Sequence, residues 1–150
     1  ASITWQMLTG PDGEIGDQLN LQNIASKGSS GRVIPLNKIL KTKLEELRQQ
    51  QISLGSWLSK SRVIQTERAS STSAQVIINM FQGWYGELGF DGCSSHSGRR
   101  TFITNAARKI STVGGSLRDV QALAGHSSLQ TTQRYIEGDN EAMKRIVDLV

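Results

Sequence analysis

The sequence predicts an α+β fold that is mostly α, in which a small three-stranded antiparallel sheet is followed by a helical bundle. Two observations support this prediction. Residues 2–36 contain three short runs of strand-forming residues separated by tight turn sequences, as in an antiparallel meander. From residue 37 onward, apolar residues recur three or four positions apart behind serines and an asparagine that can cap helices, which is typical of amphipathic helices.

The three strands are expected over residues 2–8, 16–24 and 32–36. In the first run, apolar and polar residues alternate, as a half-buried strand requires. Proline, glycine and serine separate the runs, and these residues favour tight turns. Pro35 ends the third run because proline lacks the backbone donor that a central strand needs.

The helical part is expected to begin at Asn37, whose side chain can cap a helix. The stretch from residue 49 to 71 is polar and contains a glycine and several serines, so it predicts a long loop. The residues from Ser71 to Ser73 can cap a strongly amphipathic helix. The predicted apolar face of this helix consists of Val76, Ile77, Met80, Phe81, Trp84 and Leu88.

Three further helices are predicted by caps and breaks. One is expected over residues 95–110, before a pair of glycines. Ser116 and Asp119 form a capping-box pattern for a short helix that stops at Gly125. Ser127 or Ser128 is expected to cap the next one, which ends near Tyr135.

A last helix is expected from about residue 138 to the end of the chain. Its apolar stripe would consist of Met143, Ile146, Val147 and Val150. The total length of 150 residues suits one domain. Because the chain opens at Ala1 without an initiator methionine and enters a strand-like run almost at once, it is expected to be a fragment of a longer protein or a processed chain.

Composition favours a soluble globular protein with a polyanionic partner. Apolar residues make up 37% of the chain and the net charge is +4, with a mean hydropathy of −0.33 and a pI of about 9.5. No apolar run approaches the roughly 18–20 residues that a membrane span needs. Cys93 is the single cysteine, so no internal disulfide can form and a reducing cytoplasm is the expected location. With only two histidines beside it, no metal site is expected, and no cofactor is implied.

The most informative pattern lies between residues 96 and 135. His96 and Arg99 stand three positions apart, a Gly-His pair ends at His126, and Tyr135 follows nine residues later. Together they offer a nucleophilic hydroxyl, two imidazoles and a guanidinium, groups suited to attack on a phosphodiester. Taken singly, each residue has a simpler explanation, such as packing for the tyrosine or a solvated helix face for His96 and Arg99.

In this order and spacing, the residues resemble the catalytic domain of the tyrosine recombinases, the phage integrase family. The resemblance covers roughly residues 3–150. It implies site-specific DNA recombination or integration through a covalent 3′-phosphotyrosine, on double-stranded DNA and beside other protomers of the same recombinase. It assigns Tyr135 as the nucleophile, Arg99 and His126 as phosphate ligands, and His96 as the general acid/base.

The resemblance also reaches the first part of the chain. Lys27, in a glycine-serine turn, looks like the lysine of the family's β-hairpin, which protonates the leaving 5′ oxygen. A solvated turn lysine is the simpler alternative. Arg32, Lys38 and Arg100 are expected to contact the DNA backbone, although basic residues of this kind are often only solvated.

The sequence departs from the family pattern in three respects. The family usually has a larger apolar residue where Gly98 stands, and histidine or lysine is common at the position of Arg100. The family also needs another phosphate-clamping arginine upstream of the first strand, and none is assigned here. The chain is therefore expected to be most of a catalytic domain, truncated at its N-terminal side and inactive in isolation.

Two other interpretations stay open. Residues 117–135 are compatible with a non-catalytic helix-turn-helix module, in which Gln130, Thr131 and Gln133 would project outward to read bases. A type IB topoisomerase would use the same strand-cleavage chemistry. The Gly-His motif and the compact size favour the recombinases.

Overall fold

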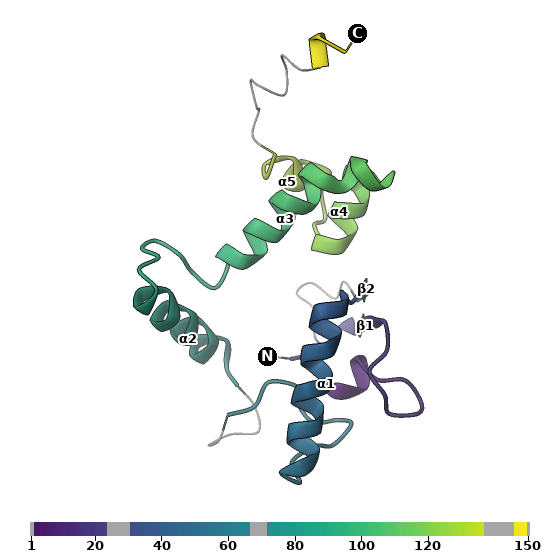
Figure 1. The fold of residues 1–150 in the computed structure, drawn as a ribbon, viewed down its shortest axis with the longest axis vertical. Coiled ribbons are helices and arrows are strands. Elements are labelled where there is room, and N and C mark those ends of the chain that lie inside the picture. The colour runs from purple at the N-terminus through teal and green to yellow at the C-terminus, as the bar shows by residue number, and fades with distance from the viewer. Residues whose placement is uncertain (1, 24–30, 67–71, 137–145, 150) are drawn as a thin grey trace. The chain divides into compact units, whose positions relative to one another are not determined.

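The computed structural model describes most of the chain: residues 2–23, 31–66, 72–136 and 146–149 (Figure 1). The chain divides into two compact units, Ala1–Asp91 and Gly92–Val150. Each unit contains its own cluster of buried apolar side chains. None of the helices in the described ranges has both the length and the apolar character that crossing a lipid bilayer demands.

The sheet of the first unit has two strands within the described residues. β1 (Gln18–Leu21) and β2 (Arg32–Pro35) pair antiparallel, with Leu19 opposite Ile34 in the register. Leu19 points into the core and is 9% exposed. The second and third predicted strands are therefore confirmed, with shorter bounds than expected.

The first predicted strand is wrong, and the three-stranded sheet is not confirmed. Trp5–Met7 forms a short 3₁₀ helix, η1. The alternation correctly marked Trp5 and Met7 as buried, at 0% and 3% exposure, but a 3₁₀ turn buries them as well as a strand would. The backbone partner of this segment is also distant in sequence. The Trp5 N–H donates to the Ser61 carbonyl at 3.2 Å, and the Gln6 N–H donates to the Ser59 carbonyl at 2.7 Å.

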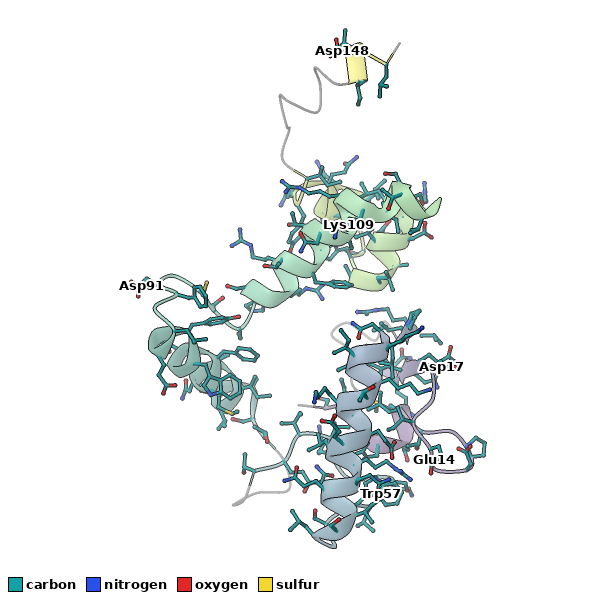
Figure 2. The ribbon with its side chains drawn as sticks, in the orientation of Figure 1. Glu14, Asp17, Trp57, Asp91, Lys109 and Asp148 are labelled. Carbon is teal, nitrogen blue, oxygen red and sulfur yellow. The ribbon has the colours of Figure 1, made fainter. Side chains whose placement is uncertain are left out.

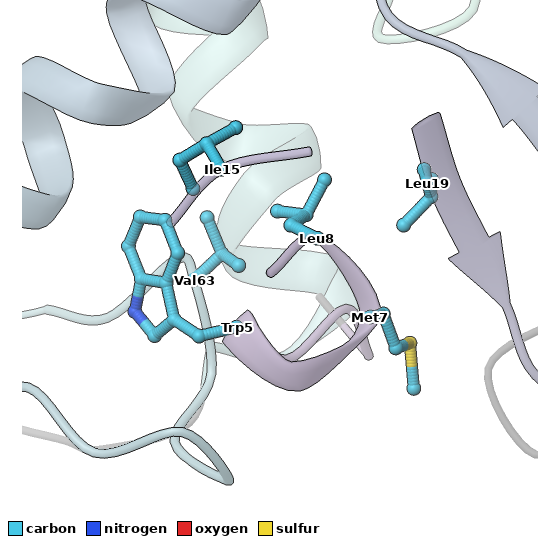
Figure 3. Packing of buried hydrophobic residues seen from close by; sticks show 6 residues of the cluster. All are labelled: Trp5, Met7, Leu8, Ile15, Leu19 and Val63. Atoms are coloured by element: carbon cyan, nitrogen blue, oxygen red, sulfur yellow. The ribbon is translucent and has the colours of Figure 1, made fainter. Parts of the chain in front are cut away.

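Trp5 is a fully buried member of the first core (Figure 3). Its indole Nε1–H donates to Gln51 Oε1 at 2.8 Å, and Gln51 Nε2 donates to the Val63 carbonyl at 3.1 Å. The buried indole N–H thus has the partner that burial requires. The core cluster consists of Trp5, Met7, Leu8, Ile15, Leu19 and Val63.

Helix α1 (Lys38–Ser53) begins where the sequence predicted. The Asn37 side chain accepts a hydrogen bond from the Leu40 N–H at 2.7 Å, which confirms the cap. The helix runs past residue 49, however, so the predicted loop over 49–71 starts too early. The reason is that Gln51, a polar residue, lies 7% exposed against the core and is held there by its two hydrogen bonds.

Arg48 connects α1 to two loop segments. Its guanidinium lies 2.9 Å from Glu45 and 3.5 Å from Glu14, and it stacks 5.4 Å from the centre of the Trp57 ring. Glu14 and Trp57 lie close together beside α1 in Figure 2. Because the arginine is 7% exposed, its aliphatic stem packs in the unit while its charge meets the carboxylates.

Helix α2 (Ala74–Glu87) is capped as predicted, since the Ser73 hydroxyl accepts from the Val76 N–H at 3.2 Å. Its aromatic residues contact one another, with the Phe81 and Trp84 ring centres 5.5 Å apart. No residue of α2 is buried, and Trp84 is 50% exposed. The amphipathic helix is confirmed, but its apolar face is not buried.

The second unit is helical in its described part, and its elements are α3 (Ser97–Lys109), the 3₁₀ helix η3 (Ile110–Val113), α4 (Leu117–Ala124) and α5 (Leu129–Gln133). Its core contains Ile103 and Val120, both 0% exposed, and Ala124 at 3%. The predicted helices of this region are confirmed within two residues, apart from the last one. That helix, predicted from residue 138, falls largely on residues 138–145 and 150, which lie outside the described residues.

Candidate active site

The start of α3 carries three of the predicted site residues. His96 is the N-cap residue, and Arg99 and Arg100 occupy the first turn, which contains no acidic residue. The positive end of the helix dipole disfavours cations at this position and favours anions. Two arginines without a compensating carboxylate therefore make this end of α3 strongly attractive to a negatively charged group.

Arg99 reaches from α3 to the end of α4. Its Nη2 donates a hydrogen bond to the Ala124 carbonyl oxygen at 2.6 Å. The last carbonyl groups of a helix have no partner within the helix and carry its partial negative charge. A guanidinium placed there satisfies one such group, and it still has other N–H donors.

Helix α4 is fixed at its start by the predicted capping box. Asp119 Oδ2 accepts hydrogen bonds from the Ser116 backbone N–H at 2.7 Å and from the Ser116 hydroxyl at 2.9 Å. The backbone hydrogen bond, followed by the hydroxyl, holds the pKa of the Asp119 carboxyl below its ordinary value. Its negative charge also lies at the helix N-terminus, where the dipole favours it.

The other end of α4 places His126. Gly125 has φ = 67°, a left-handed conformation that ends the helix and that glycine adopts without strain. The next N–H, that of His126, donates to the Gln121 carbonyl at 3.1 Å, and Gln121 Nε2 donates back to the His126 carbonyl at 3.0 Å. The His126 backbone is thus held on both sides by one residue of α4.

The His126 ring is oriented by Thr132 of α5. The two side chains meet at 2.9 Å between Nδ1 and Oγ1, and Thr132 is 0% exposed. Among the described residues, Nδ1 is the only hydrogen-bond partner of this hydroxyl, so a buried O–H that did not donate to it would be left unsatisfied, at a cost of about 1–3 kcal/mol. Donation by this hydroxyl to Nδ1 would satisfy it, and it corresponds to the tautomer whose ring proton is on Nε2.

Tyr135 lies one turn beyond Thr132 and stacks on the same imidazole. The two ring centres are 5.6 Å apart, with an angle of 17° between the ring planes. Tyr135 is half-buried and packs against the core of the second unit. The helix that carries Thr132 therefore also fixes the tyrosine, and Ser128 caps this helix by accepting from the Gln130 N–H at 3.2 Å.

The structure thus brings Arg99, His126 and Tyr135 together in the second unit, around the end of α4. His96 belongs to the same unit, but its imidazole is exposed and makes no hydrogen bond to the residues that the structure describes. Lys27 lies outside the described residues. Arg32 begins β2 and Lys38 begins α1, both in the first unit.

A hollow of about 410 Å³ adjoins Tyr135, and its lining includes two arginines that the sequence prediction missed. We call it the arginine hollow; its lining residues are Arg100, Thr104, Arg108, Thr131, Arg134 and Tyr135. The i, i+4, i+8 spacing of Arg100, Thr104 and Arg108 on one helix face was available in the sequence. The contribution of α5 was not, because it depends on how α3 and α5 are each placed against α4. In the part of the chain that is described, no three His, Cys, Asp or Glu side chains group closely enough to hold a metal ion.

Comparison with known proteins identifies the family. The phage integrase family profile matches residues 8–142. Tyrosine recombinase XerC of Corynebacterium efficiens is 30% identical over 131 residues, covering 82% of this chain and 38% of that protein. Tyrosine recombinase XerC of Roseiflexus castenholzii is 29% identical over 119 residues, covering 77% and 37%. The chain therefore spans well under half the length of these curated relatives.

Solved structures share the fold. The crystal structure of XerA recombinase superposes with a TM-score of 0.66 at 19% identity, covering 97% of this chain and 50% of that one. The Tn1549 transposon integrase in complex with a circular intermediate DNA gives a TM-score of 0.63 at 15% identity, covering 100% and 55%. A profile match over most of the chain, together with the Arg99, His126 and Tyr135 arrangement, leads to one conclusion: this chain belongs to the phage integrase family.

Proposed function

We propose that this chain is the main part of the catalytic domain of a site-specific DNA recombinase, which cuts and rejoins strands through a covalent 3′-phosphotyrosine at Tyr135. The observation that carries the proposal is the placement of Arg99, His126 and Tyr135 in one unit, with the tyrosine stacked on the histidine at 5.6 Å. Family membership supports the same chemistry.

The proposed step is a transesterification. The Tyr135 phenol oxygen attacks the phosphorus and loses its proton, while the bond from phosphorus to the 5′ oxygen breaks and that oxygen takes up a proton. No bond energy is lost to water, so the reverse attack by a 5′ hydroxyl on the phosphotyrosine rejoins the strands without ATP. Recombination results when the 5′ hydroxyl that attacks the phosphotyrosine belongs to a different DNA strand from the one that was cut.

Arg99 and His126 are proposed to stabilise the transition state. The additional negative charge develops on the non-bridging oxygens, where fixed donors lower the barrier most. A guanidinium is always charged and presents paired donors to a phosphate. The Thr132 hydroxyl at His126 Nδ1 directs the ring proton to Nε2, so the neutral imidazole can donate a hydrogen bond to a phosphate oxygen.

His96 and Lys27 are proposed to move the protons. His96 is the N-cap residue of α3, three positions before Arg99 in the sequence. An imidazole can accept the phenol proton near neutral pH. Lys27 would protonate the leaving 5′ oxygen, a role that rests on the family resemblance alone. Arg32 and Lys38 are proposed to contact the DNA backbone.

The remaining parts of the reaction are proposed to come from the rest of the protein. The curated relatives are more than twice as long as the matched region, which leaves room for a DNA-embracing domain and for the further phosphate-clamping arginine. Double-stranded DNA is the proposed substrate, and other protomers assembled on it are the proposed partners.

The helix-turn-helix alternative is less well supported. Gln130, Thr131 and Gln133 are exposed on α5, as a base-reading helix would require. That alternative, however, gives no reason for Tyr135 to stack on His126 or for Arg99 to lie at the end of α4. A type IB topoisomerase would share the cleavage step but would not exchange strands between two DNA sites.

The test is covalent capture by the full-length protein that carries this chain. The substrate is a pool of nicked duplexes of randomised sequence, which release a short fragment after cleavage and so trap the adduct. We expect protein–DNA adducts on a denaturing gel, with the nucleotide on Tyr135 by peptide mass spectrometry. Tyr135→Phe should abolish the adduct.

The matched control is Tyr85→Phe, because Tyr85 is the only other tyrosine in the chain and its aromatic contacts with Phe81 and Phe90 need no hydroxyl. It should form adduct as the wild type does. DNA binding without any adduct, unchanged in Tyr135→Phe, would favour the binding-module alternative.

A further inference from the structure

We propose that the arginine hollow binds a phosphodiester of the DNA backbone other than the one that Tyr135 attacks. This inference rests on the proposed function, since it takes DNA as the ligand. Three arginines, two threonines and Tyr135 line a space of about 410 Å³. A water molecule occupies about 30 Å³ in the liquid, so the hollow has room for a phosphate together with part of its sugar.

Within the described residues, the charge of the arginines in the hollow is not paired with a carboxylate. Among the residues that the structure describes, no carboxylate lies within ion-pair distance of Arg100, Arg108 or Arg134. Residues 92–136 contain six lysines and arginines against a single carboxylate, Asp119. That carboxylate is already held by Ser116 at 2.7 Å. Like charges gathered around one hollow repel each other, and a bound anion would relieve this repulsion.

The donors match a phosphate more closely than they match other anions. Arginine offers a planar fork of N–H groups that fits phosphate oxygens in pairs. The Thr104 and Thr131 hydroxyls can donate to further oxygens. A phosphodiester of nucleic acid presents two non-bridging oxygens and a permanent charge, and the family to which the chain belongs acts on polymers of such groups.

The position of the hollow connects it to the reaction. Arg100 directly follows Arg99, Arg134 directly precedes Tyr135, and Tyr135 itself lines the hollow. A phosphodiester bound there would hold the DNA strand beside the reacting centre. Its contribution is therefore to affinity, whereas Arg99 and His126 contribute to the rate of cleavage.

The test measures DNA binding against salt in a Tyr135→Phe background, so that chemistry does not interfere. The variant is Arg108→Gln with Arg134→Gln, which removes two charges and preserves side-chain length. Binding falls with salt in proportion to the number of phosphates neutralised. We expect the slope of log Kd against log salt to decrease by about 1 on a duplex of arbitrary sequence, measured by fluorescence anisotropy.

The matched control is Lys109→Gln, the cation adjacent to Arg108 on α3 (Figure 2), which does not line the hollow. Its slope should stay near that of the background. If the double variant changes the slope no more than Lys109→Gln does, the proposal is overturned. It is also overturned if the double variant keeps its slope but loses self-association without DNA in sedimentation, because the hollow would then take a protein carboxylate.

A second readout separates this site from the reacting one. With Tyr135 restored, the double variant should need more protein to form adduct yet reach the wild-type cleavage rate at saturation. A rate that stays low at saturation would place the arginines on the attacked phosphate and contradict the proposal. Absence of adduct in the wild type would instead count against the proposed function, while the salt slope would still decide whether the hollow binds phosphate.

Discussion

The Arg99 guanidinium donates to the Ala124 carbonyl oxygen at 2.6 Å, which ties the first turn of α3 to the last residue of α4. This contact places one arginine between a helix N-terminus and a helix C-terminus. The residues that follow Ala124 are Gly125 and His126, so the bond attaches Arg99 to the chain two residues before the histidine. A change at Arg99 therefore affects both the charge and the spacing of the site.

Arg99→Lys is expected to cut the adduct-forming rate by about 10²–10³, the loss typical of removing one fixed transition-state donor. A lysine keeps the charge but lacks the planar fork that can hold a carbonyl and a phosphate together. The assay is covalent capture under single-turnover conditions. Arg118→Lys, an exposed arginine of α4, is the control, and an equal loss in both would remove the special role of Arg99.

Thr132→Val is expected to change the proton position on His126. Valine keeps the shape of the side chain but removes the hydroxyl that donates to Nδ1 at 2.9 Å, so the Nε2–H tautomer loses its stabilisation. The nitrogen-15 chemical shifts of an imidazole report its tautomer. The chain has two histidines, so the signals that disappear in His96→Gln belong to His96 and those that remain belong to His126. Thr132→Ser should restore the wild-type pattern. A tautomer unchanged in the valine variant would show that the hydroxyl does not orient the ring.

Asp119→Asn is expected to destabilise the second unit at neutral pH and to have progressively less effect in acid. The folded pKa of Asp119 is lowered by its hydrogen bonds to Ser116, so the contribution of its charge is present above the unfolded value of about 3.9 and is lost as the pH falls through the folded value. Thermal unfolding of both proteins over this range measures the difference. Asp91→Asn controls for loss of a charge, and a difference that persists in strong acid would contradict the assignment.

Gln51→Leu is expected to destabilise the first unit, by about 1–3 kcal/mol for each buried group left unpaired. The substitution leaves the Trp5 indole N–H and the Val63 carbonyl without their hydrogen-bond partner. Urea unfolding followed by tryptophan fluorescence is suitable because all three tryptophans, Trp5, Trp57 and Trp84, lie in this unit. Gln50→Leu, at an exposed neighbouring position, should have little effect.

The sequence predicted well wherever structure is determined locally. The Asn37 and Ser73 caps, the Ser116–Asp119 capping box and the stop at Gly125 all occur at the expected residues, because each motif satisfies backbone groups within four positions. The short helix between His126 and Tyr135, with its Ser128 cap, was likewise predicted.

The sequence failed where a residue depends on a distant partner. Burial of Trp5 was predicted correctly, but the backbone of its segment is held by residues near Ser61, a region predicted to be loop. Gln51 was assigned to that loop because it is polar, although Trp5 and Val63 satisfy it in the core. The arginine hollow was missed for the same reason, because Arg108 and Arg134 line one hollow only when α3 and α5 both pack against α4.

Gly125 fixes the point at which α4 ends, and Ser116 fixes where it begins. Each residue added to or removed from the helix between them would rotate its end by about 100° and move it by about 1.5 Å, which would carry His126 away from Thr132 and Arg99 away from its carbonyl. Insertions and deletions in natural variants of this chain should therefore avoid residues 116–126. Length changes should instead accumulate outside the helices that carry the site residues, where no site residue is placed by helical phase.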